Sequence, residues 1–120
     1  MSTLLSIGRD VQGYEMYATP VCKDIFSATI AATTDTTLTV PSNFQNWIAV
    51  ITVEPSKTVW FALNTAAAAP AGATFASSSS ELIGYGFPLN NSKKVNAGDV
   101  LHFFSETGTA NMSVALYAIS

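Results

Sequence analysis

Short apolar segments alternate with clusters of turn-forming residues along most of the chain. The alternation is clearest in Thr58–Asn64, where Val59, Phe61 and Leu63 are separated by smaller or more polar residues. A period of two is typical of a strand with one buried face. The same criteria predict seven strands: Ala28–Ala32, Thr36–Val40, Trp47–Val53, Thr58–Asn64, Glu81–Tyr85, Val100–Ser105 and Met112–Ile119.

No apolar period of 3.6 residues persists over three turns, except in an alanine run that Pro70 and Gly72 interrupt. Many short strands with turn residues between them are typical of a β-sandwich or jelly roll. We therefore predict an all-β protein with one β-sandwich or jelly-roll domain of about seven to eight strands, covering residues 28–120.

The first 27 residues have a different character. They contain five of the thirteen charged residues and show no sustained period, and Gly8, Gly13 and Pro20 interrupt any helix. We predict an extended N-terminal arm, residues 1–27, with a short edge strand around Tyr14–Tyr17. Such an arm becomes ordered against a partner. Its expected partner-binding residues are Arg9, Tyr14, Met16 and Tyr17.

Residues Ala66–Ser80 form a segment of low complexity in which Phe75 is the only large side chain. One interpretation is a solvated connection, because alanine and serine clusters are common in loops. The other is a loop that packs against a neighbouring subunit through its small side chains, with Phe75 as the anchor. The sequence leaves both open.

Composition narrows the choice of partner. Of the 120 residues, 48% are hydrophobic and only 11% are charged, and the formal net charge is −3. Five basic residues are too few and too dispersed for binding to nucleic acid or to an anionic membrane. The single Cys22 rules out an intrachain disulfide, and the first residues lack the basic leader of a signal peptide. We expect a soluble protein synthesised in the cytoplasm.

Candidate catalytic chemistry is sparse. His102 is the only histidine, and it lies in a predicted strand. It is a possible base for a serine or for Cys22, but a partly buried histidine bonded to the backbone is the better interpretation. The eight carboxylates are scattered, so a glycosidase-like pair is a weak alternative. We expect no enzyme activity, no cofactor and no metal site.

Aromatic residues are the remaining candidates for binding. Trp47, Trp60, Tyr85 and Phe87 are a possible platform for stacking on sugars, whereas Trp47 also suits the core. If Val59 and its alternating neighbours face the core, Trp60 lies on the outer surface among small neutral residues. An exposed tryptophan in that setting indicates a protein–protein contact, so Trp60 and Phe75 complete the expected partner-binding residues.

The second half of the chain resembles the small β-rich head decoration (cement) proteins of tailed bacteriophages. Three stretches carry the resemblance: Thr58–Asn64 with the Ala-rich loop after it, Ser80–Ile83, and Val95–Phe103 with the closing Met112–Ala118. The resemblance implies a non-enzymatic structural protein on the outer surface of the virion. Its partner would be the major capsid protein, and it would form a homo-oligomer, with a trimer favoured over a dimer. The alternative is a carbohydrate- or host-receptor-binding module on a phage appendage.

Overall fold

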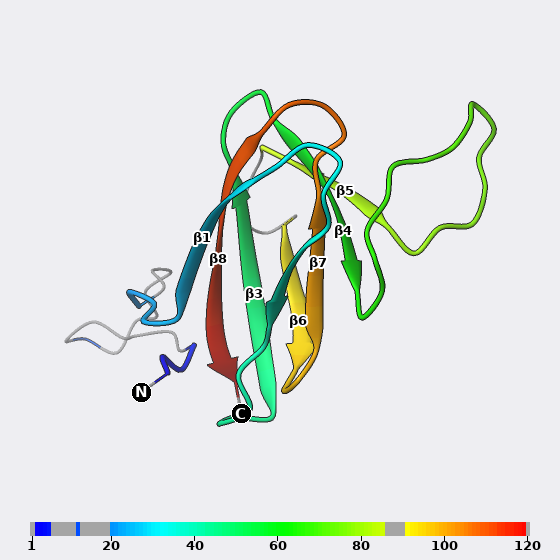
Figure 1. Ribbon diagram of the computed structural model, residues 1–120. Coiled ribbons are helices and arrows are strands. Elements are labelled where there is room, and N and C mark those ends of the chain that lie inside the picture. The colour runs from blue at the N-terminus through cyan, green and yellow to red at the C-terminus, as the bar shows by residue number, and fades with distance from the viewer. Residues whose placement is uncertain (1, 6–11, 13–19, 86–90, 120) are drawn as a thin grey trace.

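The computed structural model describes residues 2–5, 12, 20–85 and 91–119. These residues form eight strands and no helix, arranged as two antiparallel sheets that face each other (Figure 1). The strands are β1 (Ile25–Ile30), β2 (Thr36–Thr39), β3 (Asn46–Val53), β4 (Thr58–Leu63), β5 (Glu81–Gly84), β6 (Ser92–Asn96), β7 (Val100–Phe104) and β8 (Ala110–Ile119). Sheet I has the order β1-β8-β3-β6 and sheet II the order β2-β7-β4-β5. The predicted all-β sandwich is confirmed.

The strands pair in a nested order. β1 pairs with β8, β2 with β7, β3 with β6 and β4 with β5, and these pairs fall alternately in sheet I and sheet II. Each connection between consecutive strands therefore crosses from one sheet to the other, except the connection between β4 and β5, which are paired in sheet II.

All seven predicted strands are present, and apart from shifts of one or two residues at strand ends the prediction differs from the structure in two ways. β6 was missed, because Ser92–Asn96 contains two lysines and has only one buried apolar residue, Val95. β1 begins at Ile25 rather than at Ala28, so the strand includes residues that we assigned to the arm. Edge strands show weak alternation because partners cover them less completely.

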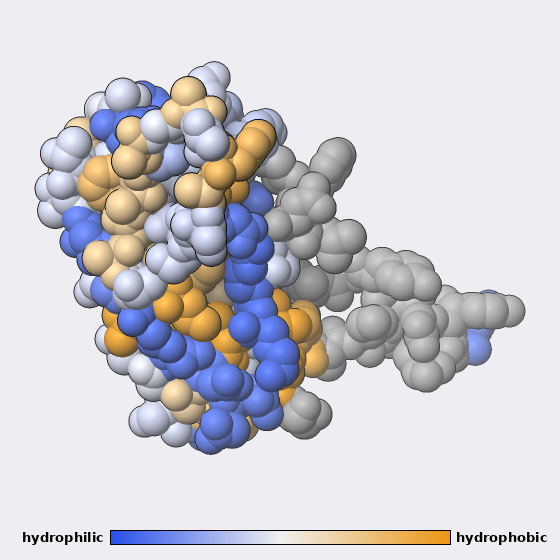
Figure 2. Space-filling model, turned by 90° about the vertical axis from the view of Figure 1, so that its right-hand side faces the viewer, coloured by the Kyte–Doolittle hydropathy of each residue, from blue (hydrophilic) through white to orange (hydrophobic). Residues whose placement is uncertain are grey.

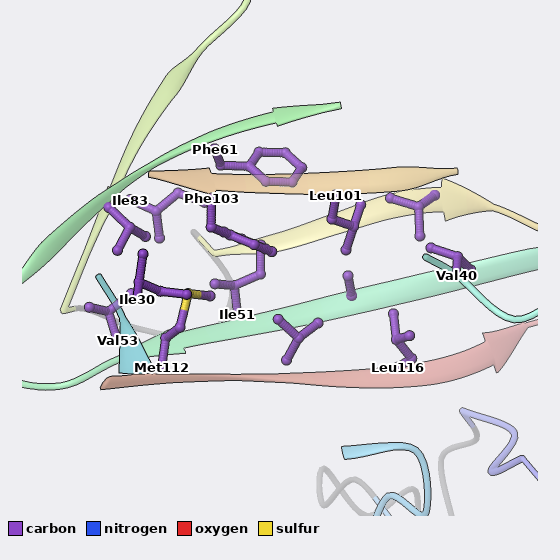
Figure 3. Packing of buried hydrophobic residues seen from close by; sticks show 14 of the residues in the cluster. Ile30, Val40, Ile51, Val53, Phe61, Ile83, Leu101, Phe103, Met112 and Leu116 are labelled. Carbon is purple, nitrogen blue, oxygen red and sulfur yellow. The ribbon is translucent and has the colours of Figure 1, made fainter. Parts of the chain in front are cut away.

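The core lies between the sheets and is filled by alternate residues of the inner strands. Figure 3 shows Leu101 and Phe103 of sheet II pointing toward Ile51 and Leu116 of sheet I, and Phe61 belongs to the same buried cluster. The rings of Phe61 and Phe103 lie 5.5 Å apart between centroids.

Trp47 of β3 belongs to this core and is completely buried. Its indole Nε1 donates a hydrogen bond to the carbonyl oxygen of Phe44 (3.0 Å), and the two rings meet edge to face. A buried indole needs such an acceptor, since an unpaired N–H is costly in an apolar interior. The core interpretation of Trp47 is confirmed.

The described parts of the N-terminal segment lie along β8 beyond the end of β1. Leu4 forms a parallel bridge with Ala118, and the hydroxyl of Tyr117 donates to the carbonyl oxygen of Pro20 (2.8 Å). The backbone N–H of Lys23 donates to the hydroxyl of Thr3 (2.9 Å), which ties the two stretches to each other. Both ends of the segment between residues 5 and 20 are therefore held at one edge of sheet I.

No helix in the described part of the chain has the length and apolar character needed to cross a membrane.

Candidate functional site

The outer surface of sheet II carries the first group of candidate residues. Val59 and Phe61 of β4 are buried, so Trp60 between them faces outward, as the alternation predicts. The strand register places Trp60 opposite Leu82 of β5 on one side and opposite Phe104 of β7 on the other. These three residues form one apolar row across three strands, and we call it the Trp60 row.

The Trp60 row is open to solvent over part of its area. Leu82 is 51% exposed, and Trp60 and Phe104 are both partly exposed. Cross-strand neighbours on one face of a sheet lie close enough for their side chains to touch. The row is therefore a continuous apolar surface on an otherwise small and polar face.

Sequence reasoning identified Trp60 but missed Leu82 and Phe104. Alternation within Glu81–Gly84 and Val100–Phe104 was a usable signal, since Ile83 and Phe103 are buried and their neighbours must face outward. The missing information was the register, because a shift of one residue moves every side chain to the opposite face.

Residues 64–80 connect β4 to β5 and are anchored at their base. Asn64 has a positive φ of 59°. Its side-chain oxygen accepts a hydrogen bond from the backbone N–H of Val100 (2.8 Å), and its side-chain NH₂ group donates one to the carboxylate of Asp99 (3.2 Å). Asparagine suits this position, because its short polar side chain tolerates the left-handed region and bonds to nearby groups. The hydroxyl of Ser80 accepts the backbone N–H of Ala68 (3.1 Å), which closes the base from the other end.

Beyond this base the loop projects from the sandwich (Figure 1). Every residue from 70 to 79 is exposed, and Phe75 is fully exposed. Figure 2 looks onto the side of the molecule from which the loop projects. The upper part of this face is mostly white or pale orange, and strongly hydrophilic residues gather mainly in a band below. Phe75 thus offers its whole ring to another molecule.

His102 lies on the outer face of sheet II beside the base of the loop. Its Nδ1 is 2.7 Å from Oδ2 of Asp35, and Oδ1 of Asp35 accepts the backbone N–H of Ala67 (3.2 Å). The histidine was expected to have a backbone partner, and its partner is a carboxylate instead. The arrangement joins β7, the β1–β2 turn and the loop base through one side chain, Asp35.

Cys22 precedes β1 and packs against sheet I, whereas His102 belongs to sheet II. Cys22 is buried, and its Sγ is 3.1 Å from the carbonyl oxygen of Leu116 on β8, which it approaches as a donor. His102 is on the outer face of sheet II, so the structure does not bring these two residues together. The cysteine packs residues 20–24 against sheet I.

The proposed sugar platform is not assembled as the sequence suggested. Trp47 is in the core and is unavailable for stacking, whereas Trp60 is partly exposed and Tyr85 is 68% exposed. Phe87 lies outside the described residues, as do Arg9, Tyr14, Met16 and Tyr17 of the arm.

Within residues 2–5, 12, 20–85 and 91–119, no three His, Cys, Asp or Glu side chains gather closely enough to hold a metal ion. No protein-family model, curated protein or solved structure matches the chain.

Proposed function

We propose that the chain is a non-enzymatic decoration protein that binds the outer surface of a tailed-phage head and stabilises contacts between major capsid subunits. The observation that carries this proposal is the low-charge surface formed by the Trp60 row and the projecting loop. Thr58–Ser80 contains no charged residue, and this stretch supplies both Trp60 and Phe75.

Physical chemistry supports a protein partner for this surface. Burying charged groups at an interface is costly, whereas Ala, Ser and Thr lose little hydration and little side-chain entropy. Large apolar residues near the centre of an interface contribute most of the binding energy. Many copies on a lattice reinforce one another even when each contact is weak.

The fold is also compatible with the family that the sequence resembles. The nested order of the strands, with first and last strands paired and alternate pairs in opposite sheets, supports classing the sandwich as a jelly roll. This agrees with the β-rich domain that the resemblance implies, and the proposal places the protein on the virion.

Co-sedimentation with heads of the phage that encodes the chain tests the proposal. We expect Trp60→Ala and Phe75→Ser each to weaken binding at least tenfold, since central hot-spot residues contribute about 2 kcal/mol or more. Thr52→Lys on the outer face of sheet I is the matched control and should bind as the unmodified protein does. Absence of binding by the unmodified protein, or equal binding by all variants, would contradict the proposal.

The arm requires a different variant from a simple deletion. Removing residues 1–20 would also remove the hydrogen bond between Thr3 and Lys23 and the contacts of Thr3, Leu4 and Pro20 with β8. Replacing Tyr14, Met16 and Tyr17 together by serine keeps those contacts. If the arm binds the capsid, this triple variant sediments less with heads, while its thermal unfolding is unchanged.

The partly exposed indole of Trp60 also supports a second candidate, a carbohydrate- or receptor-binding module. Tryptophan faces stack on sugar rings, and the indole of Trp60 is partly exposed beside the exposed Thr58. A glycan array separates the two candidates. Binding to a glycan that Trp60→Ala abolishes, together with no binding to heads, would favour the module.

A further inference from the structure

The outer edge of sheet I is an unprotected strand. β1 has six residues, Ile25 to Ile30, with no charge, no proline and no glycine, and five of the six are exposed. Ile25 is 54% exposed and Phe26 is 39% exposed. Proteins normally protect an edge strand with charges, prolines, bulges or short length, because its free backbone groups can pair with another chain.

The backbone groups on this edge are available for pairing. The carbonyl oxygen of Asp24 accepts the N–H of Leu116 on β8 (2.9 Å), in register with the β1–β8 ladder. Bonding to one neighbour alternates along an antiparallel strand. The N–H and C=O groups of Ile25, Ser27 and Thr29 therefore point away from β8, and no described strand pairs with that side of β1.

The other three sheet edges discourage pairing with a second copy. β6 carries Lys93 and Lys94, which would face like charges. β5 has only four residues and begins at Glu81. β2 also has only four residues and is followed closely by Pro41. Among the described edges, β1 alone is long, uncharged and free of flanking proline.

A cavity of about 190 Å³, partly open to solvent, lies at this edge between β1 and β2. Its apolar lining includes Phe26, Ala28, Leu38, Phe103 and Met112. A cavity of ~150 Å³ holds a benzene ring. The space is therefore large enough for one phenylalanine ring but smaller than the ~300 Å³ of an ordinary ligand pocket.

The chain itself supplies a ring in the required position. If two copies pair antiparallel about a two-fold axis at Ser27, the outward-pointing groups of Ile25, Ser27 and Thr29 exchange hydrogen bonds with those of Thr29, Ser27 and Ile25 in the second copy. This register keeps the inner faces of both sheets on the same side. It sets Phe26 of one copy opposite Ala28 of the other, beside the cavity.

We propose that two copies of this chain associate through β1, with Phe26 of each copy inserted into the cavity next to Ala28 of the other. The two copies of sheet I then form one continuous sheet. A two-fold contact of this kind closes at two copies, because each β1 edge has one free side. The proposal thus specifies a dimer where the family resemblance favoured a trimer.

Sedimentation equilibrium of the purified protein across micromolar concentrations tests this arrangement. We expect a mass twice the 12.6 kDa of one chain. Ser27→Lys should weaken dimerisation at least tenfold, because it sets two positive charges opposite each other on an exposed outer face. Thr52→Lys is the control. Thr52 lies opposite Ser113 of β8, which in turn lies opposite Ser27, so Thr52 is in the same row of outward-facing residues as Ser27 but two strands from the edge.

A mixing experiment tests the register. Ser27→Lys and Ser27→Glu should each dimerise at least tenfold more weakly alone, and an equimolar mixture should recover dimerisation through opposite charges. Phe26→Ala should weaken the dimer at least tenfold while the protein remains folded by circular dichroism. The proposal would be overturned by an unmodified protein that is monomeric at 200 μM or trimeric. It would also be overturned by a Ser27→Lys variant that dimerises as tightly as the unmodified protein, or by a mixture that dimerises no more tightly than either variant alone. None of these measurements uses phage heads, so their failure is distinct from failure of the decoration role.

Discussion

The two open edges of the sandwich, one between β5 and β6 and the other between β1 and β2, are built in opposite ways. At the β5–β6 edge, Nζ of Lys93 lies 2.6 Å from Oε2 of Glu81 across the gap between the sheets. Both residues occupy inward-facing positions, because the register aligns Lys93 with buried Ala49 and Glu81 with buried Phe61. The amide group of Asn91 adds a hydrogen bond to the carbonyl oxygen of Gly84 (2.9 Å).

At the β1–β2 edge, apolar residues line an incompletely filled cavity, and Phe26 reaches solvent. Inward-pointing charges on edge strands oppose the addition of another strand, whereas an apolar uncharged edge permits it. The β5–β6 edge is thus closed by contacts within the chain, whereas the β1–β2 edge has no such closure among the described residues.

The largest expected difference between the two edges is in side-chain truncation. Ile83 of β5 is 2% exposed, so Ile83→Ala should lower the free energy of unfolding by about 2–5 kcal/mol. Phe26→Ala should cost only about 1 kcal/mol, because the ring is partly exposed and already borders a cavity. Urea unfolding in the Ser27→Lys background measures both without a contribution from dimerisation. Equal losses would show that the edges are equally packed.

The second expected difference is in the response to a larger side chain, which should lower the stability of the protein at the β5–β6 edge and raise it at the β1–β2 edge. Ala49 of β3 is completely buried in the row of Lys93, and Ala49→Val should destabilise the protein by about 1–3 kcal/mol through overpacking. Ala28 lines the cavity, so Ala28→Val should stabilise the Ser27→Lys protein by about 0.5–1 kcal/mol through burial of methyl groups. Thermal unfolding of both variants provides the measurement, and a loss of stability in Ala28→Val would contradict the cavity.

The smallest expected effect concerns the ion pair at the β5–β6 edge. The side chains of Lys93 and Glu81 are 24% and 56% exposed, so water and salt screen their interaction. A double-mutant cycle with Lys93→Gln and Glu81→Gln should give a coupling of about 0.2–1 kcal/mol. The coupling should shrink in 1 M NaCl, and a coupling that salt leaves unchanged would argue against a screened, exposed pair.

Several features of the fold could be predicted from the sequence because they depend on local pattern. Alternation in Thr58–Asn64 identified β4 and placed Trp60 on the outside. The predicted strand Val100–Ser105 identified β7, and Gly98 in the turn before it adopts a φ of 82° that glycine tolerates best. The low complexity of Ala66–Ser80 predicted a loop, and this loop projects with Phe75 exposed at its surface.

Other features depend on strand pairing and were invisible in the sequence. Asp35 and His102 are far apart in the chain and meet because β2 pairs with β7. The prediction missed β6 because its inward-facing Lys93 forms an ion pair with Glu81 of β5, so the strand lacks the apolar alternation that would identify it.

The sequence by itself determined seven of the eight strands and the buried side of strands such as β4 at Val59 and Phe61, since these follow from periodicity within one segment. Only the tertiary structure decided which strands lie at the edges, which residues flank Trp60, and where a cavity remains. These depend on the order and register of strands from distant parts of the chain, and the energy that selects them is shared over the whole core.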